Sequence, residues 1–442
     1  MGGTDGVSLE IEKRKQILEK HGIEVKLIAG KRSRGADYII EELEWDDGII
    51  PIIKENGFRY FEKKYLEAEE LKRKIKKVSN IIEEKLEVIQ KKEKFDFVLI
   101  HNIFSFGGHI AAAKSFAKWI EKNKLPTIAT HHDFFWERKE FRAPRGEYLK
   151  NYMEKYMPPQ SSYIEHVVIN SLAQQELKKR NNIDSVIIPD IFDFNQAQWK
   201  KDSFSRDFLN QFDISPNDLI ILQATRVIPR KGIEMAMDFT KKMQENMAKL
   251  RGRKLYNGKR LDKNAEVVLV AAGYAEDEKQ DYLFKLKTKA FDQRIRVKFI
   301  SNYVKAERAF HGGAKTYSLW DAYVYADLVT FPSIWEGWGN QFIEAVFAKR
   351  PIVVFEYPVF KKDIEPEGYK FISLGSGARK NEETGFYEVP DKNLKKAVEK
   401  ATRWFLDENL GKKLETNFKT GQKYHNFHVL ENFLADRLRL RQ

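Results

Sequence analysis

Short apolar runs that alternate with longer helical patterns constrain the fold of this chain more than any other feature. Unbroken apolar runs separated by helices are typical of parallel strands that are buried on both faces. Two such series in succession predict an α/β fold with two Rossmann-like, doubly wound domains that face each other across a cleft. The expected strands are Val25–Ala29, Phe97–His101, Thr127–Thr130, His166–Asn170 and Ser185–Pro189 in the first half, and Leu219–Ala224, Glu266–Ala271, Arg296–Ile300, Leu328–Phe331 and Ile352–Phe355 in the second.

The length of the chain also favours two domains, because 442 residues exceed what one hydrophobic core usually supports. The boundary is expected in the polar stretch Phe192–Pro216. The predicted parts are an N-terminal domain (1–195), a C-terminal domain (196–415) and a C-terminal helix (416–442). The charged pattern from Tyr65 to Lys92 predicts a helix with one exposed face.

Composition limits the kinds of site that the chain can build. It contains no cysteine, which excludes disulfides and cysteine-ligated metal sites and fits a cytoplasmic location. No apolar run is long enough to span a membrane, and the first residues do not resemble a signal peptide. The net charge of +13 favours phosphate-bearing ligands, with peripheral contact with an anionic membrane left open. The alternative is a solvated, lysine-rich surface.

The basic residues do not predict a nucleic-acid partner. The densest basic tracts are Leu71–Lys77 and Lys249–Arg260. Neither tract interleaves aromatic residues in the way that a groove for single-stranded nucleic acid does.

The sequence FPSIWEGWGNQFIE (331–344) is the strongest indication of a ligand site. A strand is expected to end at its first residue, and an amphipathic helix is expected to begin near Asn340. Backbone N–H groups at such a helix start can hold an anion or a hydroxyl-rich ligand. Gly337 and Gly339 would let that ligand approach the backbone closely.

Two glutamates, Glu336 and Glu344, lie in the same segment with seven residues between them. Along a continuous helix they would be about 12 Å apart on the axis. A glycosidase carboxylate pair needs a separation of roughly 5 to 9.5 Å, so this chemistry is disfavoured. We expect the two carboxylates to grip two parts of one extended ligand.

A second candidate site follows the strand at the start of the second half. Arg226 and Lys231 in LQATRVIPRKG (222–232) lie at the carboxyl end of that strand, where doubly wound sheets bind ligands. Two cations there can neutralise a diphosphate and stabilise it as a leaving group. The alternative is a pair of solvated surface charges.

A third candidate, THHDFFWER (130–138), follows a strand of the first half. Its carboxylates, arginine and tryptophan suit the hydroxyls, phosphate and ring face of a sugar. His131, His132 and Asp133 are adjacent, a spacing that suits metal chelation poorly, so no metal site is expected. The alternative for a histidine here is a buried, hydrogen-bonded core residue. His101 and Asn102 lie at a neighbouring strand end.

The N-terminal sequence GGTDG (2–6) could cradle a phosphate before a helix that starts near Val7. It matches neither a P-loop nor the dinucleotide fingerprint, and Asp5 could instead cap that helix. No strand precedes the glycines, so we expect the first strand of this domain to be missing.

Together these motifs resemble the retaining glycosyltransferases of family 4, which have the GT-B fold, over nearly the whole chain. FPSIWEGWGNQFIEAVFAKRPIVV is similar to the family signature E-G-F-G-x-x-x-x-E-A…G-x-P-V-V, and TGFYEVP (384–390) resembles its N-G-F-L-V-P stretch. The sequence departs from the family at Asn340 and Gln341, where Leu-Pro is usual. The resemblance implies that the C-terminal helix crosses back to the first domain.

The resemblance also implies roles for individual residues. Glu336 would contact the donor sugar, Glu344 the ribose, and Arg226 with Lys231 the diphosphate, while His132 would lie near the reacting centre. The expected catalytic residues are His132, Glu336, Arg226 and Lys231. The expected donor-binding residues are Gly2, Gly3, Arg226, Lys231, Glu336, Gly337, Trp338, Gly339, Asn340, Gln341 and Glu344. The expected acceptor-binding residues are Asp5, His101, Asn102, Asp133, Trp136, Glu137 and Arg138.

The implied activity is transfer of glucose or mannose from UDP-glucose or GDP-mannose to a hydroxyl of a polar acceptor, such as a phosphorylated sugar or a glycerate-type solute. Transfer would retain the anomeric configuration without a protein nucleophile, a required metal or a permanently bound cofactor. Three alternatives stay open. They are a transferase that acts on a membrane lipid or polysaccharide, a basic carbohydrate- or nucleic-acid-binding protein without turnover, and a nucleotide-sugar hydrolase or epimerase.

Overall fold

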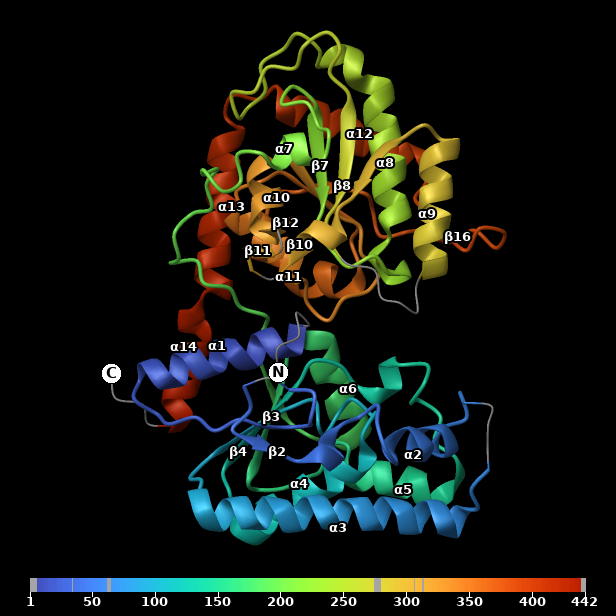
Figure 1. Cartoon of the computed structure of the whole chain (residues 1–442), viewed down its shortest axis with the longest axis vertical. Helices are drawn as coiled ribbons and strands as arrows, with labels where there is room; N and C mark the ends of the chain where they lie inside the picture. Colours follow the sequence, from blue (N-terminus) through green and yellow to red (C-terminus); the bar gives the residue numbers. More distant parts are fainter. Residues whose placement is uncertain are drawn as a thin grey trace. The chain divides into compact units, whose positions relative to one another are not determined.

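The computed structural model describes residues 6–33, 35–61, 65–273, 280–305, 307–311 and 314–438. The chain separates into two compact units. Unit 1 comprises Met1–Asp190 with Leu430–Gln442, and unit 2 comprises Ile191–Val429. Each unit is a parallel sheet with helices packed on it (Figure 1), which confirms the predicted α/β class with two Rossmann-like parts.

The sheet of unit 2 has six parallel strands in the order β15-β14-β13-β7-β8-β9. The strands are β7 (Leu219–Gln223), β8 (Val267–Ala271), β9 (Arg296–Phe299), β13 (Leu328–Phe331), β14 (Ile352–Val354) and β15 (Ile372–Ser373). The order reverses between β7 and β13, which pair with Ile221 opposite Leu328. Ligands of doubly wound sheets bind beyond the carboxyl ends of the strands at such a switch point.

The central strands of unit 2 form because their residues are apolar and have cover on both faces. Every residue of β7, β8 and β13 is buried. Helix α8 (Ile233–Asn246) packs on β7 and β8, and α11 (Asn340–Phe347) packs on β13 and β14. The other elements of unit 2 are α7 (Phe208–Gln211), α9 (Gln280–Asp292), β10 (Val304–Lys305), β11 (Ala309–His311), β12 (Ala314–Ser318), α10 (Leu319–Tyr325), β16 (Arg379–Lys380), β17 (Tyr387–Glu388), α12 (Asp391–Phe405) and α13 (Leu410–His425).

Unit 1 has a four-stranded parallel sheet in the order β3-β4-β5-β6. Its strands are β3 (Val98–His101), β4 (Thr127–His131), β5 (Ile164–Val168) and β6 (Ser185–Ile187). Its helices are α1 (Gly6–Lys20), α2 (Ile50–Gly57), α3 (Ala68–Glu93), α4 (Ile110–Asn123), α5 (Gly146–Tyr156), α6 (Ser171–Asn181) and most of α14 (Phe427–Leu438). No helix in the described ranges is long and apolar enough to cross a membrane.

Two sequence-based expectations were wrong. The run Val25–Ala29 gives only the short strand β1 (Ile28–Ala29), which pairs with β2 (Tyr38–Ile39) in a separate two-stranded sheet, because its residues are only half buried. The C-terminal segment forms two helices, α13 and α14, where one was expected. Asn426 between them is extended, and its side chain accepts hydrogen bonds from the backbone N–H groups of Phe194 (3.0 Å) and Phe427 (2.8 Å).

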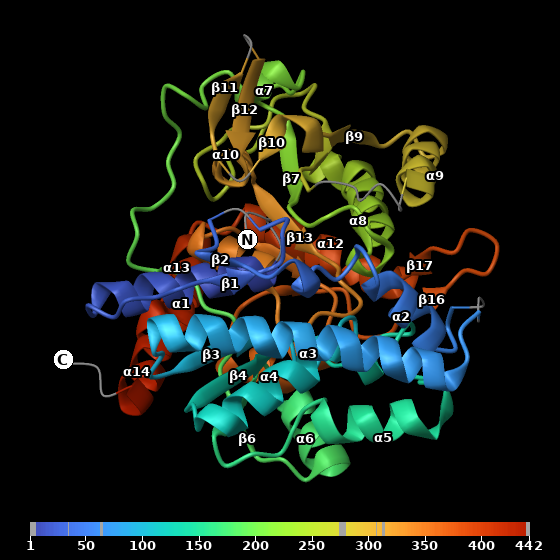
Figure 2. The same cartoon turned by 60° about the horizontal axis from the view of Figure 1, so that its bottom comes forward.

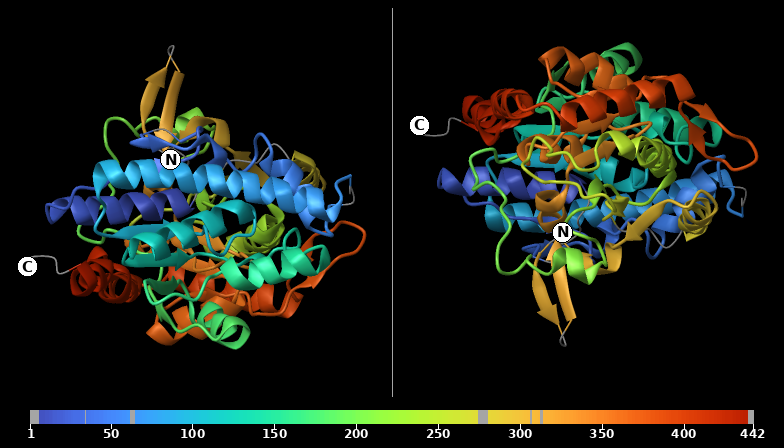
Figure 3. Two further views of the ribbon diagram at one scale, coloured as in Figure 1. Left: turned by 90° about the horizontal axis from the view of Figure 1, so that it is seen from below. Right: turned by 90° about the horizontal axis from the view of Figure 1, so that it is seen from above.

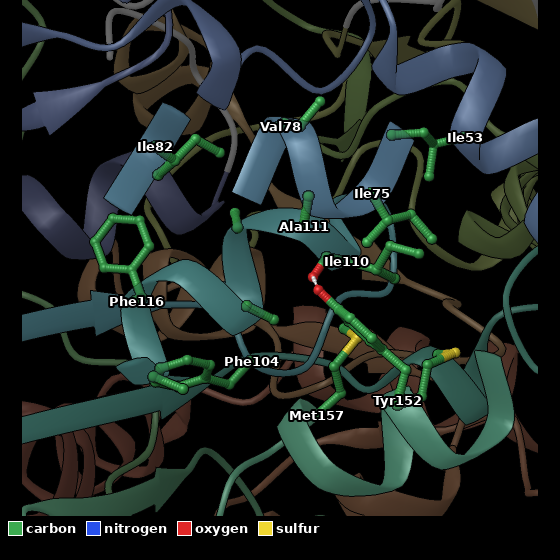
Figure 4. Packing of buried hydrophobic residues seen from close by; sticks show 14 of the residues in the cluster. Ile53, Ile75, Val78, Ile82, Phe104, Ile110, Ala111, Phe116, Tyr152 and Met157 are labelled. Carbon is green, nitrogen blue, oxygen red and sulfur yellow. Dashed lines mark hydrogen bonds between the residues drawn. The ribbon is translucent and has the colours of Figure 1, made fainter. Parts of the chain in front are cut away.

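The core of unit 1 lies between α3, its longest helix, and helices α2, α4 and α5. Ile75, Val78 and Ile82 share one face of α3, at the spacing that an amphipathic helix requires. This face packs against α4, which runs beside α3 in Figures 2 and 3. Figure 4 shows the contact from close by, including the hydrogen bond of 3.2 Å from the Tyr152 hydroxyl to the Ile110 carbonyl oxygen.

This packing predicts a large effect of truncating Ile82, whose side chain has no exposed surface. We expect Ile82→Ala to destabilise unit 1 by about 2–5 kcal/mol, because the substitution loses apolar contacts and leaves a cavity. Urea unfolding followed by far-ultraviolet circular dichroism would measure the change. Val88→Ala on the same helix is the control, since Val88 is 67% exposed and should shift stability by at most about 0.5 kcal/mol. Equal shifts for the two variants would contradict this packing.

Candidate active site

The switch point of unit 2 brings together two residues that the sequence assigned to the donor site. The loop after β7 carries Lys231 in a short 3₁₀ turn, and the loop after β13 carries Glu336. The Lys231 Nζ atom contacts Glu336 Oε1, and Arg230 Nη1 lies 2.6 Å from Glu336 Oε2. Both Lys231 and Glu336 are buried. The structure therefore places a carboxylate between two cations at the position where this fold binds ligands.

Burial and the neighbouring charges shift the pKa values of Lys231 and Glu336 in opposite directions. Burial lowers the pKa of Lys231 from 10.5 to about 8, although the charge of Glu336 acts to raise it. Burial acts to raise the pKa of Glu336, but the charges of Lys231 and Arg230 outweigh it, and the pKa is lowered. Arg226 also lies near enough for its charge to lower the pKa of Lys231. Two cations therefore contact the Glu336 carboxylate and a third, Arg226, lies near Lys231, an arrangement that can accept a diphosphate.

Two glycines fix the loops that form this site. Gly232, at the start of α8, has a φ of 60°, and a Cβ there would lie 2.5 Å from the carbonyl oxygen of Pro332. Gly339, which precedes α11, has a φ of 146°, and a Cβ there would lie 2.8 Å from the Tyr357 hydroxyl oxygen. Gly232 thus permits the loop after β7 to approach the loop after β13, and Gly339 permits the start of α11 to approach Tyr357.

The start of α11 presents backbone rather than side chains. The Trp338 side chain is buried against His425, with ring centroids 5.2 Å apart. The Tyr357 hydroxyl donates to the Trp338 carbonyl oxygen and so holds the loop. Asn340 and Gln341 open the helix and are half buried. Ligand contacts by Trp338 would therefore come from its main chain.

The second glutamate of the segment has different partners from the first. Glu344 lies on α11, and its Oε2 atom is 3.0 Å from the Tyr323 hydroxyl. Glu336 lies in the loop before the helix, so the seven intervening residues are only partly helical. The expected binding of Glu336 and Glu344 to two parts of one ligand stays a prediction.

In unit 1, parallel pairing of β3 and β4 brings two predicted histidines together. His101 ends β3, and His132 follows β4 directly. Their Nδ1 and Nε2 atoms are 3.2 Å apart, and the rings are stacked with centroids at 5.5 Å. Burial lowers the pKa of His101 well below its ordinary value, and the charge of Arg14 acts in the same direction. His101 is therefore neutral at neutral pH.

Asn102, Asp133 and Arg138 form a network that holds the loop after β4. Asn102, with a φ of 59°, accepts from the His132 backbone N–H at 2.8 Å and donates to Asp133 Oδ1 at 3.1 Å. Arg138 Nε donates to Asp133 Oδ2 at 2.6 Å. These predicted acceptor-binding residues therefore position His132, and their contact with an acceptor stays a prediction.

Trp136 and Glu137 contribute mainly to the local turn. Trp136 stacks on Phe134 at 4.2 Å between centroids, and the Arg180 guanidinium lies 5.2 Å from its ring. Glu137 Oε2 accepts from the Phe134 backbone N–H at 2.7 Å. The remaining predictions in this region, Gly2, Gly3 and Asp5, lie outside the described residues.

Two site residues were missed by sequence reasoning. Arg230 joins the ion cluster, and its adjacency to Lys231 was an available signal. Tyr323 contacts Glu344 from α10, and nothing in the sequence links these two positions.

Unit 1 holds two further buried polar pairs. On α1, Arg14 Nη1 lies 3.0 Å from Glu10 Oε2, at a helical spacing that the sequence could have indicated. His131 Nε2 lies 2.9 Å from His166 Nδ1, which supports the core alternative for this histidine. Within the described ranges, no three His, Asp or Glu side chains are placed to hold a metal ion.

The ionisation of Lys231 predicts how nucleotide affinity depends on pH. A bound diphosphate raises the pKa of Lys231 above its ligand-free value of about 8, so binding above that pH takes up a proton. The affinity for GDP or UDP should then fall by up to about tenfold per pH unit above pH 8. Isothermal titration calorimetry would measure this slope.

Lys231→Arg is the matched control for this slope, because its guanidinium stays charged throughout the range. Its affinity should be nearly independent of pH. A wild-type profile as flat as that of Lys231→Arg would contradict a direct contact between Lys231 and the diphosphate.

Comparisons with known proteins identify the family of this chain. The family model described as "Glycosyl transferases group 1" matches residues 205–421. The chain is 38% identical to mannosylglucosylglycerate synthase of Petrotoga mobilis, covering 92% of both chains. It is 36% identical to mannosylglucosylglycerate synthase of Thermotoga maritima, covering 98% of this chain and 96% of the relative.

Solved structures give the fold. Sucrose-phosphate synthase from Thermosynechococcus elongatus superposes with a TM-score of 0.61 at 14% identity, covering 98% of this chain and 93% of that one. The chain therefore belongs to the group 1 glycosyltransferases, which have the GT-B fold.

Proposed function

We propose that this enzyme transfers a mannosyl residue from GDP-mannose to a hydroxyl of glucosylglycerate, with retention of the anomeric configuration. The cation cluster around Glu336 at the switch point of unit 2 carries the proposal, since it suits the diphosphate of a nucleotide sugar. The two full-length relatives are named for a mannosylated glucosylglycerate product. Of the two donors that the sequence suggested, GDP-mannose carries the matching sugar. The narrower assignment to family 4 is part of this proposal.

The donor would be held entirely by unit 2. Arg226, Arg230 and Lys231 contact the diphosphate and stabilise the negative charge that develops as it leaves. Glu336 exchanges its contact with Lys231 for contacts with the hexose, while Glu344 accepts hydrogen bonds from the ribose. The main chain at the start of α11 supports the hexose.

The transfer step needs no protein nucleophile. The bond between C1 of mannose and the phosphate oxygen breaks as the acceptor oxygen forms a bond to C1 on the same face. The acceptor proton passes to the departing phosphate oxygen, which yields GDP. Glu336 orients the hexose and supports the positive charge at C1, while the expected role of His132 near the reacting centre stays a prediction. His101, Asn102, Asp133 and Arg138 keep His132 in place on the acceptor side.

The cationic side chains of the proposed donor site can take the place of a metal ion. Arg226, Arg230 and Lys231 supply the positive charge that a divalent cation provides in other phosphate-transfer sites. We therefore propose that transfer proceeds without added metal, so that activity persists in the presence of EDTA.

Incubation with GDP-mannose and glucosylglycerate tests the proposal directly. We expect mannosylglucosylglycerate and GDP in equal amounts, and NMR coupling constants should show the anomeric configuration of the donor. Transfer of glucose from UDP-glucose in preference would contradict the donor assignment. Release of mannose at an equal rate without glucosylglycerate would contradict transfer and indicate a hydrolase.

A site variant should remove most of this activity. We expect Lys231→Gln to lower kcat by about 10²- to 10³-fold, because it removes a charge that stabilises the leaving group. Lys285→Gln is the control, since Lys285 lies on the exposed side of α9 and should leave kcat unchanged. Melting temperatures of both variants would show that each remains folded. Equal kcat values for the two variants would contradict the role of Lys231.

A further inference from the structure

A buried phenol connects two parts of the proposed donor site. The Tyr323 hydroxyl lies 3.0 Å from Glu344 Oε2 and 3.2 Å from the backbone carbonyl oxygen of Gln341. Tyr323 has no exposed surface. The hydroxyl therefore contacts both the carboxylate that we assign to the ribose and the first turn of α11, which we assign to the hexose.

The helix that carries this phenol is held firmly at its start. Ser318 and Asp321 form a capping box at the N-terminus of α10, in which the Ser318 backbone N–H donates to Asp321 Oδ2 at 2.8 Å. Arg308 binds both oxygens of the Asp321 carboxylate, with Nε 3.1 Å from Oδ2. Asp321 is fully buried. Tyr323 thus projects from a helix whose N-terminus is anchored by Arg308 and by its own capping box.

An aromatic residue also ties α10 to α11. The Trp199 ring packs on Tyr323 at 5.4 Å between centroids and on Phe347, at the end of α11, at 4.9 Å. These contacts fix both ends of α11 relative to α10, and both helices are labelled in unit 2 in Figure 1. The direction of the Tyr323 hydroxyl toward Glu344 is therefore set by packing.

The phenol acts as a donor to Glu344. Burial raises the pKa of Tyr323 well above its ordinary value, and the charge of Glu344 raises it further. The hydroxyl consequently keeps its proton at working pH. A hydrogen bond to an ionised acceptor is stronger than one to a neutral carbonyl, so the proton is directed mainly at the carboxylate.

We infer that Tyr323 is a positioning residue that orients the Glu344 carboxylate for the ribose hydroxyls of the donor and links this carboxylate to the first turn of α11. The inference rests on the proposed function, in which Glu344 binds ribose. With one carboxylate oxygen held by the phenol, the plane of the carboxylate is fixed before the nucleotide binds. Nucleotide binding then costs less side-chain entropy at Glu344. Tyr323 would then determine how strongly the enzyme prefers a ribose over a deoxyribose.

The test compares the Kd of GDP with the Kd of 2′,3′-dideoxy-GDP by isothermal titration calorimetry. The ratio of the two constants reports only the contribution of the ribose hydroxyls. We expect the wild type to prefer GDP, and we expect Tyr323→Phe to reduce this preference about 5- to 10-fold, the usual net effect of one intramolecular hydrogen bond. The Kd of the dideoxy nucleotide should change little. Both ligands are measured on the same sample, so partial unfolding does not alter the ratio.

Tyr325→Phe is the matched control, because Tyr325 lies on the same helix and its hydroxyl donates to the Ser205 carbonyl oxygen at 2.8 Å. It should keep the wild-type ratio. Glu344→Gln separates the two possible failures. If Glu344→Gln abolishes the preference and Tyr323→Phe keeps it, the inference about Tyr323 is overturned while the ribose role of Glu344 stands. If Glu344→Gln keeps the wild-type preference, the ribose role of Glu344 is overturned, and the inference falls with it.

Discussion

The buried ion pair between Lys231 and Glu336 is the interaction on which the proposed donor site depends. A charge that is removed from water is costly unless it is paired, and each of these two groups supplies the partner that the other needs. Arg230 completes the cluster with its contact of 2.6 Å to Glu336. The ligand-free site therefore holds a carboxylate among cations, and a donor diphosphate can take the place of that carboxylate without leaving the cations unpaired.

The fold brings this pair together through its strand order. The loops after β7 and β13 are neighbours because these two parallel strands pair at the point where the strand order of the sheet reverses. Gly232 lets the two loops approach closely, since a side chain there would collide with the Pro332 carbonyl oxygen, and Gly339 lets the start of α11 lie against Tyr357. The same sheet seats α11 on β13 and β14, with Glu344 facing Tyr323. The doubly wound topology thus determines both where the loops of the site lie and which side chains meet there.

The sequence predicted elements whose formation depends on local patterns and missed contacts that depend on the fold. Strands such as β7 were predictable because four of its five residues are apolar and all are buried, whereas β1 was overestimated because its residues are only half buried. Lys231 and Glu336 were predicted to be donor-site residues from their motifs, and this role stays a prediction. Their mutual contact was not predictable, because 105 positions separate them in the chain. The break at Asn426 depends on the backbone of Phe194, which is even more distant in sequence, at 232 positions.

A crystal structure of the complex with GDP-mannose tests the central claim most directly. The account predicts diphosphate oxygens within hydrogen-bonding distance of Lys231 and Arg230, with Glu336 turned from Lys231 toward the mannose. It would be contradicted by a complex in which the contact between Lys231 and Glu336 persists unchanged and the diphosphate binds elsewhere on the protein.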